Sequence, residues 1–336
     1  MTVSRLPRSF LVLCIATPLW GCGNASDPWI PQDVQDTERN AEVAQFASIN
    51  PPPYSSGLVV AEGEFTAQAT MTPWSSWWYP MWDDFLYAER NGIPSPLEKY
   101  DNYAHLYFNR TTTAAAVERN VAERSHADSW AGLCYAWALA SIMEPEPQTA
   151  RTFGSLSFEV GDLKALLLKT YEAVKDVRVV GDRNDDAWDD VYADVSPNYF
   201  HEVLTVELFQ NKRPFIIDRD AGYEVWNMPI YKAATKITRD PTASNTVHVR
   251  TVIFVATTDV KNYDFVGTEA TTREYTYDLQ GRWRGNQFVV QGGAWTGTSR
   301  ADHPDFLILR PDKVDRATVN PEIDIAIVDA ILGKVQ

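Results

Sequence analysis

The sequence predicts an α+β fold, with helices in the N-terminal part and an antiparallel sheet after them. Two observations lead to this prediction. Between residues 133 and 210, several segments carry apolar side chains at helical spacing. After residue 214, short runs rich in β-branched and aromatic residues are separated by Gly, Asn or Asp turns. Helices followed by a run of strands are typical of α+β proteins, whereas alternation would indicate α/β proteins.

The helical segments have recognisable ends. The first begins after Asp128 or Ser129, which are candidate caps, and stops at the prolines of "EPEP". The second carries a stripe of leucines, and the third leads into a short apolar strand. The expected helices cover residues 133–143, 159–176, 198–210 and the tail after residue 321.

The expected strands are short and follow one another closely along the chain. Each is bounded by turn residues, which favours hairpins between neighbours. They cover residues 214–218, 246–257, 271–283, 286–295 and 305–311.

The N-terminus reads as an export signal. Residues 1–22 combine Arg5 and Arg8 with an apolar run and end in Leu-Trp-Gly-Cys22, which resembles a bacterial lipoprotein signal with Cys22 as the lipidated residue. Ordinary secretory cleavage nearby is the alternative. No later run reaches the roughly 18 apolar residues that a membrane span needs. We expect an exported protein, on the cell surface or secreted.

Composition divides the remainder into two parts. Residues 23–63 are acidic and proline-rich, which predicts a linker with few contacts, and residues 64–336 form the expected catalytic domain. The formal charge of −15 argues against nucleic acid or anionic lipid as a partner. The aromatic residues between 66 and 109 are expected to pack in the core rather than to form a ligand platform. We expect a monomer.

Cys134 is the thiol that remains after Cys14 leaves with the signal and Cys22 is lipidated or left at the chain start. An odd cysteine in an exported protein is a candidate for reactivity. A helix N-terminus lowers the pKa of a thiol, and Cys134 lies at the head of the first expected helix. Gly132 is expected to leave room for a substrate backbone. The alternative is a buried, inert thiol that acts as a small apolar residue.

A thiol nucleophile needs an imidazole partner, and His248 is our candidate. It begins an expected strand that can face the N-terminus of a helix, whereas His126, His201 and His303 suggest local or structural roles. Asp278 lies near the end of the next strand, where a hairpin would return it beside His248 and let it orient the imidazole. Asp278 is alternatively a turn residue before Gly281.

This order of Cys, His and Asp resembles papain-like peptidases and transglutaminases. That resemblance implies a helical part carrying the cysteine and an antiparallel sheet carrying the histidine and aspartate. Papain-like enzymes have a Gln about six residues before the cysteine, where this chain has Asp128. The Cys134 N–H and an indole N–H, from Trp130 or from a tryptophan between Trp74 and Trp82, are the expected oxyanion donors instead.

A closer resemblance lies at Val225-Trp226-Asn227-Met228-Pro229-Ile230. This hexapeptide resembles the V-W-N-Q-P-V elicitor peptide of the secreted transglutaminase elicitor family of plant pathogens. "SWAGLCYAWA", "DLKALL", "SPNYFHEVL", "YTYDLQG" and "QGGAWTGTSRADHPDFLI" are similar as well, so the resemblance covers roughly residues 73–309.

Membership of this family implies acyl transfer from a protein glutamine to a lysine amine through a Cys thioester. The implied catalytic residues are Cys134, His248 and Asp278, with Trp130, Gly132 and Trp226 around the oxyanion and substrate. The implied partners are protein substrates that carry Gln and Lys.

Two alternative functions use the same sequence features. A papain-like peptidase, or a deamidase, would use the same residues with water as the acyl acceptor. A non-catalytic surface protein would display V-W-N-M-P-I as a recognition loop and keep Cys134 inert.

No cofactor is required by these motifs. The acidic stretch from Asp182 to Asp194 begins like an EF-hand, but Ala187 and Ala193 replace the required Gly and Glu. A looser calcium site and a solvated acidic loop both remain open. No His and Cys spacing indicates a zinc site.

Overall fold

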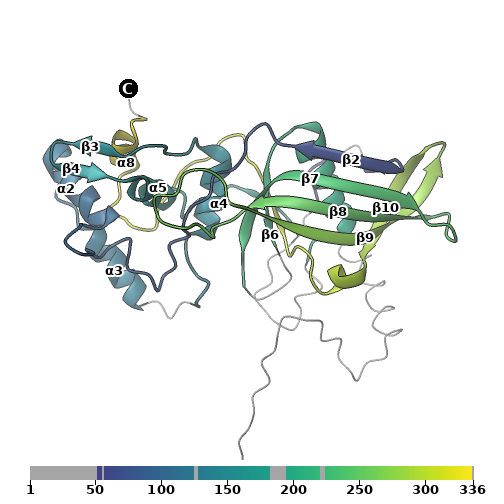
Figure 1. The fold of residues 1–336 in the computed structure, drawn as a ribbon, viewed down its shortest axis with the longest axis horizontal. Helices are drawn as coiled ribbons and strands as arrows, with labels where there is room; N and C mark the ends of the chain where they lie inside the picture. The colour runs from purple at the N-terminus through teal and green to yellow at the C-terminus, as the bar shows by residue number, and fades with distance from the viewer. Residues whose placement is uncertain (1–50, 55–56, 125–127, 182–193, 220–223, 335–336) are drawn as a thin grey trace, which may run out of the picture.

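The computed structural model describes residues 51–54, 57–124, 128–181, 194–219 and 224–334. The expected signal (residues 1–22), the lipidation site Cys22 and nearly all of the acidic stretch from Asp182 lie outside these residues. Within them the predicted α+β fold is confirmed: helices gather at one end of an elongated molecule and a sheet at the other (Figure 1).

The helical lobe holds a small hairpin and most of the helices. Its apolar core is built around α4 and α5, whose inward side chains Trp137, Leu139, Leu166 and Leu167 are fully buried. The elements of this lobe are α2 (Pro96–Phe108), α3 (Ala114–Arg124), α4 (Cys134–Met143), β3 (Arg151–Phe153), β4 (Leu156–Phe158), α5 (Val160–Lys169) and α8 (Ile325–Leu332).

The sheet lobe is built on one sheet of nine strands, in the order β1-β10-β9-β8-β7-β6-β11-β5, with β2 also paired to β7. Every pairing that the structure describes is antiparallel. Its strands are β1 (Val59–Val60), β2 (Gly63–Gln68), β5 (Arg178–Val180), β6 (Phe215–Asp218), β7 (Asn227–Arg239), β8 (Thr246–Ala256), β9 (Ala270–Arg284), β10 (Gln287–Trp295) and β11 (Leu307–Leu309).

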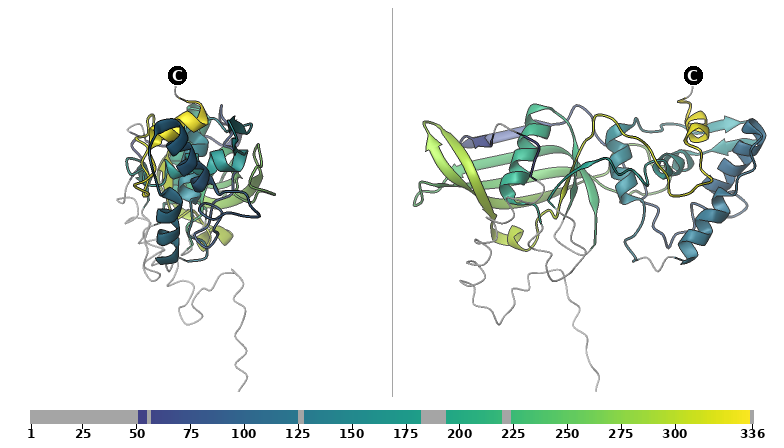
Figure 2. Two further views of the ribbon diagram at one scale, coloured as in Figure 1. Left: turned by 90° about the vertical axis from the view of Figure 1, so that its left-hand side faces the viewer. Right: turned by 180° about the vertical axis from the view of Figure 1, so that it is seen from behind.

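A continuous helical segment covers one face of the sheet. It consists of α7 (Pro197–Val203) and the π-helix η1 (Leu204–Gln210), and Figure 2 shows it from behind, lying over the strands. A short 3-10 turn, η2 (Gly297–Arg300), follows β10. Residues 198–210 were expected to be one regular helix, and the change to π geometry after Val203 was not predicted.

The long strand β7 joins the two lobes. Its first residues pair with β6, Asn227 opposite Asp218, and its later residues pair with β2 and β8. The sequence analysis did not predict this strand, which contains Pro229, a residue that cannot donate to a ladder and is unusual in a central strand. The structure accommodates Pro229 next to a register shift between Ile230 and Lys232.

The linker prediction is wrong at its C-terminal end. Residues 23–63 were expected to make few contacts, yet β1 pairs with β10 through Val59 and Val60. Leu58 and Val60 are each only 7% exposed. The folded body therefore begins before residue 64, because this apolar pair completes the edge of the sheet.

The aromatic-rich segment packs as expected. Trp74, Tyr79, Tyr100 and Tyr103 are buried in the core of the helical lobe, whereas Trp82 is 64% exposed. Within the part of the chain that the structure describes, none of the helices has the length and apolar character needed to span a membrane.

Candidate active site around Cys134

Cys134 is the first residue of α4, as the sequence predicted, and its thiol is not in a disulfide. Leu133 takes the N-cap position and gives no side-chain hydrogen bond, so the expected caps Asp128 and Ser129 are wrong. The N–H groups of an uncapped first turn remain available as donors. The helix ends at Glu144, in the "EPEP" run, where the backbone becomes extended.

The start of β7 closes over the thiol. Cys134 is 6% exposed, its Sγ lies 3.6 Å from the Val225 carbonyl oxygen, and the Asn227 Nδ2 lies 3.9 Å from the same sulfur. The Trp226 N–H donates to Asp218 Oδ1 over 2.7 Å, which fixes the backbone between the two contacts. Val225 and Asn227 therefore form one wall of a thiol site.

The hexapeptide V-W-N-M-P-I is thus interior to the folded protein. Five of its six residues are buried, and only Trp226 is partly exposed. The alternative in which this segment is an exposed recognition loop is contradicted by that burial. Its residues instead line Cys134 and start the central strand.

The electrostatics of the site favour the neutral thiol. Burial raises the pKa of Cys134, and the Asp218 carboxylate raises it further. Hydrogen bonds from the backbone and side chain of Asn227 and from the backbone of Tyr135 lower it, but less than burial raises it. The expectation that the helix N-terminus lowers the pKa of this thiol is wrong for this state of the protein, because desolvation outweighs the donors.

His248 and Asp278 pair with each other as the hairpin argument predicted. They are directly opposite on β8 and β9, and His248 Nδ1 lies 2.6 Å from Asp278 Oδ1. The other ring nitrogen, Nε2, lies 3.1 Å from Asp240 Oδ2. The hydrogen bond that His248 donates to the Asp278 carboxylate raises the pKa of His248, burial opposes the rise, and Asp240 adds to it.

This pair does not reach Cys134, so the predicted triad is wrong. Cys134 contacts Asn227 at the start of β7, whereas His248 is opposite Thr238 near the end of that strand. At about 3.3 Å per residue, the strand between Asn227 and Thr238 spans about 35 Å. Figure 1 shows α4 at the near end of β8 and β9 and the β7–β8 turn at the far end. The antiparallel register carries the start of β8 away from the helix.

The other described histidines are engaged elsewhere. His303 lies 2.8 Å from Asp194 through Nε2 and 2.9 Å from the Ser299 carbonyl through Nδ1, and both its partners hold it inside the sheet lobe. His201 is hydrogen-bonded to Tyr277. His105 lies on α2 and is exposed. His126 lies outside the described residues.

Asn227 supplies the side-chain amide that the sequence analysis found missing. Its Nδ2 approaches the sulfur from β7, and its Oδ1 has no hydrogen-bond partner among the described residues. An amide donor beside the nucleophile, together with the Cys134 N–H, can stabilise a developing oxyanion. The V-W-N motif includes this asparagine, but Val225 and Asn227 lie 91 and 93 residues from Cys134 along the chain, so the sequence did not indicate their contacts with the thiol.

The expected indole donors are mostly committed elsewhere. The indole N–H groups of Trp74, Trp77 and Trp82 donate to the Glu144 carbonyl, the Asp83 carboxylate and the Ser129 carbonyl, respectively. Trp130 packs at the edge of the core. The structure assigns these tryptophans a different role: Trp78 contacts Trp82 and Trp226 edge to face, with ring centroids 6.4 and 5.4 Å apart, and forms an aromatic wall beside the helix start.

Gly132 leaves room for the Trp78 ring to pack against the start of α4. A Cβ built on Gly132 would lie 2.5 Å from the Trp78 ring and 2.9 Å from the Trp78 carbonyl oxygen. The space that was expected to admit a substrate backbone is filled by Trp78. The Leu133 N–H donates to the same Trp78 carbonyl over 2.7 Å, so the glycine lets the tryptophan segment dock on the helix start.

No metal-binding cluster is found among the described residues, where no group of three or more His, Cys, Asp or Glu side chains converges. The acidic stretch after residue 181 lies outside them, so the calcium hypothesis stays a prediction.

Comparisons with known proteins agree with the family resemblance of the sequence motifs. The model of the transglutaminase elicitor family matches residues 109–251, a range that contains Cys134 and the V-W-N motif. No curated protein sequence matches the chain. The crystal structure of the GP42 transglutaminase from Phytophthora sojae is similar, with a TM-score of 0.63 and 21% identity over 88% of this chain and 97% of that one. The predicted resemblance is confirmed: residues 109–251 match the transglutaminase elicitor family, within a fold similar to that of GP42 transglutaminase.

Proposed function

We propose that this protein is an acyltransferase that joins protein glutamine side chains to primary amines through a thioester on Cys134. The observation that carries the proposal is the position of the sulfur at an uncapped helix start, approached by the Asn227 amide and bordered by the Trp78 and Trp226 rings. The similarity to a transglutaminase structure supports it.

The proposed reaction has two steps, acylation of Cys134 and transfer of the acyl group to an amine. The Cys134 sulfur bonds to the glutamine carboxamide carbon, the C–N bond breaks, and ammonia leaves with the proton that the thiol gives up. The Asn227 amide and the Cys134 N–H hold the oxyanion between these events. An amine then attacks the thioester, and its proton returns to the sulfur. The aromatic wall limits water at the thioester, which favours amines over hydrolysis.

Access to the sulfur requires the start of β7 to move. Cys134 Sγ is within hydrogen-bond distance of the Val225 carbonyl, and the thiol is almost fully buried. A substrate carboxamide must displace this contact before attack. The described conformation is therefore a closed state of the proposed enzyme.

The test is incorporation of a labelled primary amine into casein. Cys134→Ala should abolish incorporation, and Asn227→Ala should reduce kcat by about a hundredfold or more if its amide holds the oxyanion. His248→Ala should retain activity because the ring lies at the far end of the sheet, and it serves as the control for a histidine far from the site. Full activity of Cys134→Ala would refute the proposal.

The general base is to be assigned by the same assay. None of the four described histidines is in hydrogen-bond contact with Cys134 Sγ. His126, which lies outside the described residues, is the remaining candidate, and His126→Ala is compared with wild type and with His105→Ala as the exposed control. Loss of kcat and of the pH dependence of the rate in His126→Ala alone would identify it as the base.

The second candidate is a non-catalytic protein with an inert thiol. The raised pKa of Cys134 and its contact with the Val225 carbonyl favour it. Iodoacetamide distinguishes the two: a thiol that opens to substrate is alkylated in the folded protein and protected by a glutamine substrate, and an inert one is neither. Casein cleavage without amine incorporation would indicate a peptidase.

Export and lipidation are separate proposals that rest on residues 1–22 alone. Labelled fatty acid should be incorporated into the wild-type protein and not into Cys22→Ala. Secretion of both forms without label would favour ordinary signal cleavage.

A further inference from the structure

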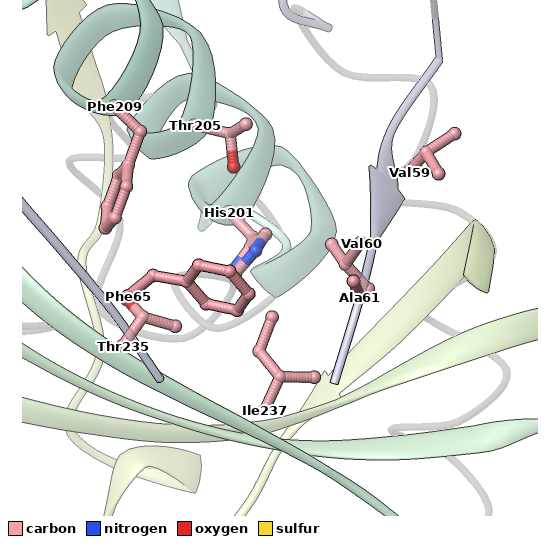
Figure 3. A pocket seen from close by; sticks show the side chains of 9 residues that line it. All are labelled: Val59, Val60, Ala61, Phe65, His201, Thr205, Phe209, Thr235 and Ile237. Carbon is pink, nitrogen blue, oxygen red and sulfur yellow. The ribbon is translucent and has the colours of Figure 1, made fainter. Parts of the chain in front are cut away.

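The sheet lobe contains a cavity far from Cys134. It has a volume of about 230 Å³ and lies between the helical segment α7–η1 and strands β1, β2 and β7 (Figure 3). Ile237, one of its lining residues, is opposite Val249 near the distal end of β7, whereas Cys134 contacts the beginning of that strand. The cavity is therefore independent of the proposed acyl-transfer site.

The walls are apolar apart from a few groups. Val60, Phe65, Phe209 and Ile237 contribute hydrocarbon from β1, β2, η1 and β7. Phe65 is 39% exposed, which places it at the surface end of the cavity. A cavity of ~150 Å³ with apolar walls holds benzene, so this one admits a ring with a small substituent. One wall is a π-helix, a geometry that is rare and frequent at functional sites.

His201 is the buried polar group that faces this space. Figure 3 shows its ring projecting from α7 among Phe65, Val60 and Ile237. The residue is 4% exposed, and burial lowers the pKa of His201 to about 4, so the ring is neutral at neutral pH. A neutral imidazole donates through one nitrogen and accepts through the other.

A chain of hydroxyl groups decides which nitrogen carries the proton. Thr235 Oγ1 lies 3.0 Å from Thr251 Oγ1, which lies 3.0 Å from the Tyr277 hydroxyl, which lies 2.6 Å from His201 Nδ1. Burial raises the pKa of Tyr277, and the hydrogen bond between its hydroxyl and that of Thr251 lowers it. A phenol O–H is a stronger donor than a neutral imidazole N–H, so we assign the Tyr277 hydroxyl as the donor to Nδ1 and the ring proton to Nε2.

The Nε2–H lacks an acceptor in the described part of the chain. His201 has its Nδ1 contact with Tyr277 and no further hydrogen bond among these residues. Nε2 is accessible from the cavity, so an occupant that accepts its proton takes the place of water there.

We propose that the cavity binds an uncharged, mainly apolar molecule about the size of a substituted aromatic ring, with a single carbonyl oxygen that accepts a hydrogen bond from His201 Nε2. The apolar walls take the ring, and the neutral imidazole selects the carbonyl. A carboxylate is disfavoured, because no cation lines the cavity among the described residues.

The test uses two probes of the same shape. Acetophenone carries the carbonyl, and isopropylbenzene replaces the oxygen by a methyl group. Both are titrated into the full chain, with binding followed by the rise in Tm and, for acetophenone labelled with ¹³C at the carbonyl, by its chemical shift. We expect acetophenone to bind about tenfold more tightly, with a downfield carbonyl shift.

Variants separate the hydrogen bond from the shape of the cavity. His201→Phe should reverse the preference toward isopropylbenzene, because the carbonyl is then buried without a donor, while the exposed control His105→Phe should keep the preference for acetophenone. Thr205→Trp, which fills the cavity from η1 and leaves the hydroxyl chain intact, should abolish binding of both probes. It keeps the proposal testable if His201→Phe does not fold.

Three results would overturn the proposal. They are equal affinity of both probes for the wild-type chain, no rise in Tm with either probe at millimolar concentration, and undiminished binding to Thr205→Trp.

Discussion

At the scale of single residues, the thiol of Cys134 is governed by competition between burial and donors. The helix start, Asn227 and Tyr135 all favour the thiolate, yet desolvation and Asp218 keep the proton on the sulfur. A reactive cysteine in this fold therefore depends on opening of the β7 start rather than on static pKa lowering. The charge of Asp218 is the part of this balance that a conservative substitution can remove.

Asp218→Asn should make the thiol more reactive. The substitution removes a negative charge that raises the pKa of Cys134 and keeps an oxygen for the Trp226 N–H. We expect the pH dependence of iodoacetamide alkylation to move to lower pH. Asp278→Asn, at the far end of the sheet, is the control and should leave the profile unchanged. A shift to higher pH in Asp218→Asn would contradict this account.

His248 should affect stability and its pH dependence rather than catalysis. Asp278 raises the pKa of His248 in the folded state. The stabilisation is therefore complete below its unfolded pKa of about 6.5 and is lost as pH rises through the higher folded value. The ring is 46% exposed, so solvent screening limits the effect to roughly 0.5 kcal/mol.

The measurement is urea unfolding of His248→Gln and wild type. The variant should be less stable at about pH 5.5 and equal to wild type at about pH 9. His105→Gln is the exposed control. A stability difference that grows with pH would show that the sign of this linkage is wrong.

At the scale of elements, the site is a junction of three segments. The start of α4 packs on the tryptophan segment at Gly132, where a side chain has no room, and the start of β7 contacts Cys134 through Asn227. The helix was predictable from its apolar run and proline stop. The segments against which the helix packs were not predictable, because a periodic pattern does not indicate which segment its apolar face will contact.

Gly132→Ala should disrupt this junction. The added Cβ would meet the Trp78 ring and carbonyl, so we expect a loss of about 1–3 kcal/mol in the free energy of unfolding and weaker amine incorporation. Gly292→Ala is the matched control, since a Cβ there meets no atom within 4 Å. Chemical denaturation compares the two variants. Equal stability of both would mean that Trp78 yields without cost.

At the scale of the whole molecule, the sheet extends further toward the N-terminus than the composition suggests. Proline and acidic residues before residue 64 predicted a linker, but β1 adds an edge strand to β10 within that segment. The average composition of a segment does not reveal a short strand within it. The buried side chains of Leu58 and Val60 are enough to hold β1 at the edge of the sheet.

Val60→Ala tests this boundary. Val60 is 7% exposed, so its truncation should lower the free energy of unfolding by about 2 kcal/mol. Val59→Ala is the adjacent control: Val59 is 42% exposed and should change stability by less than about 0.5 kcal/mol. Equal small effects would place the boundary after β1, as the sequence suggested.

Local pattern was sufficient for much of this protein. The α+β class, the helix headed by Cys134, the strands after residue 245 and the pairing of His248 with Asp278 all follow from periodicity and hairpin connectivity, which act over short distances along the chain. Tertiary structure alone decided that α4 abuts the start of β7, so that Asn227 and not His248 meets the thiol. That contact joins residues 93 positions apart, and it depends on which apolar surfaces bury each other, a choice that no local period encodes.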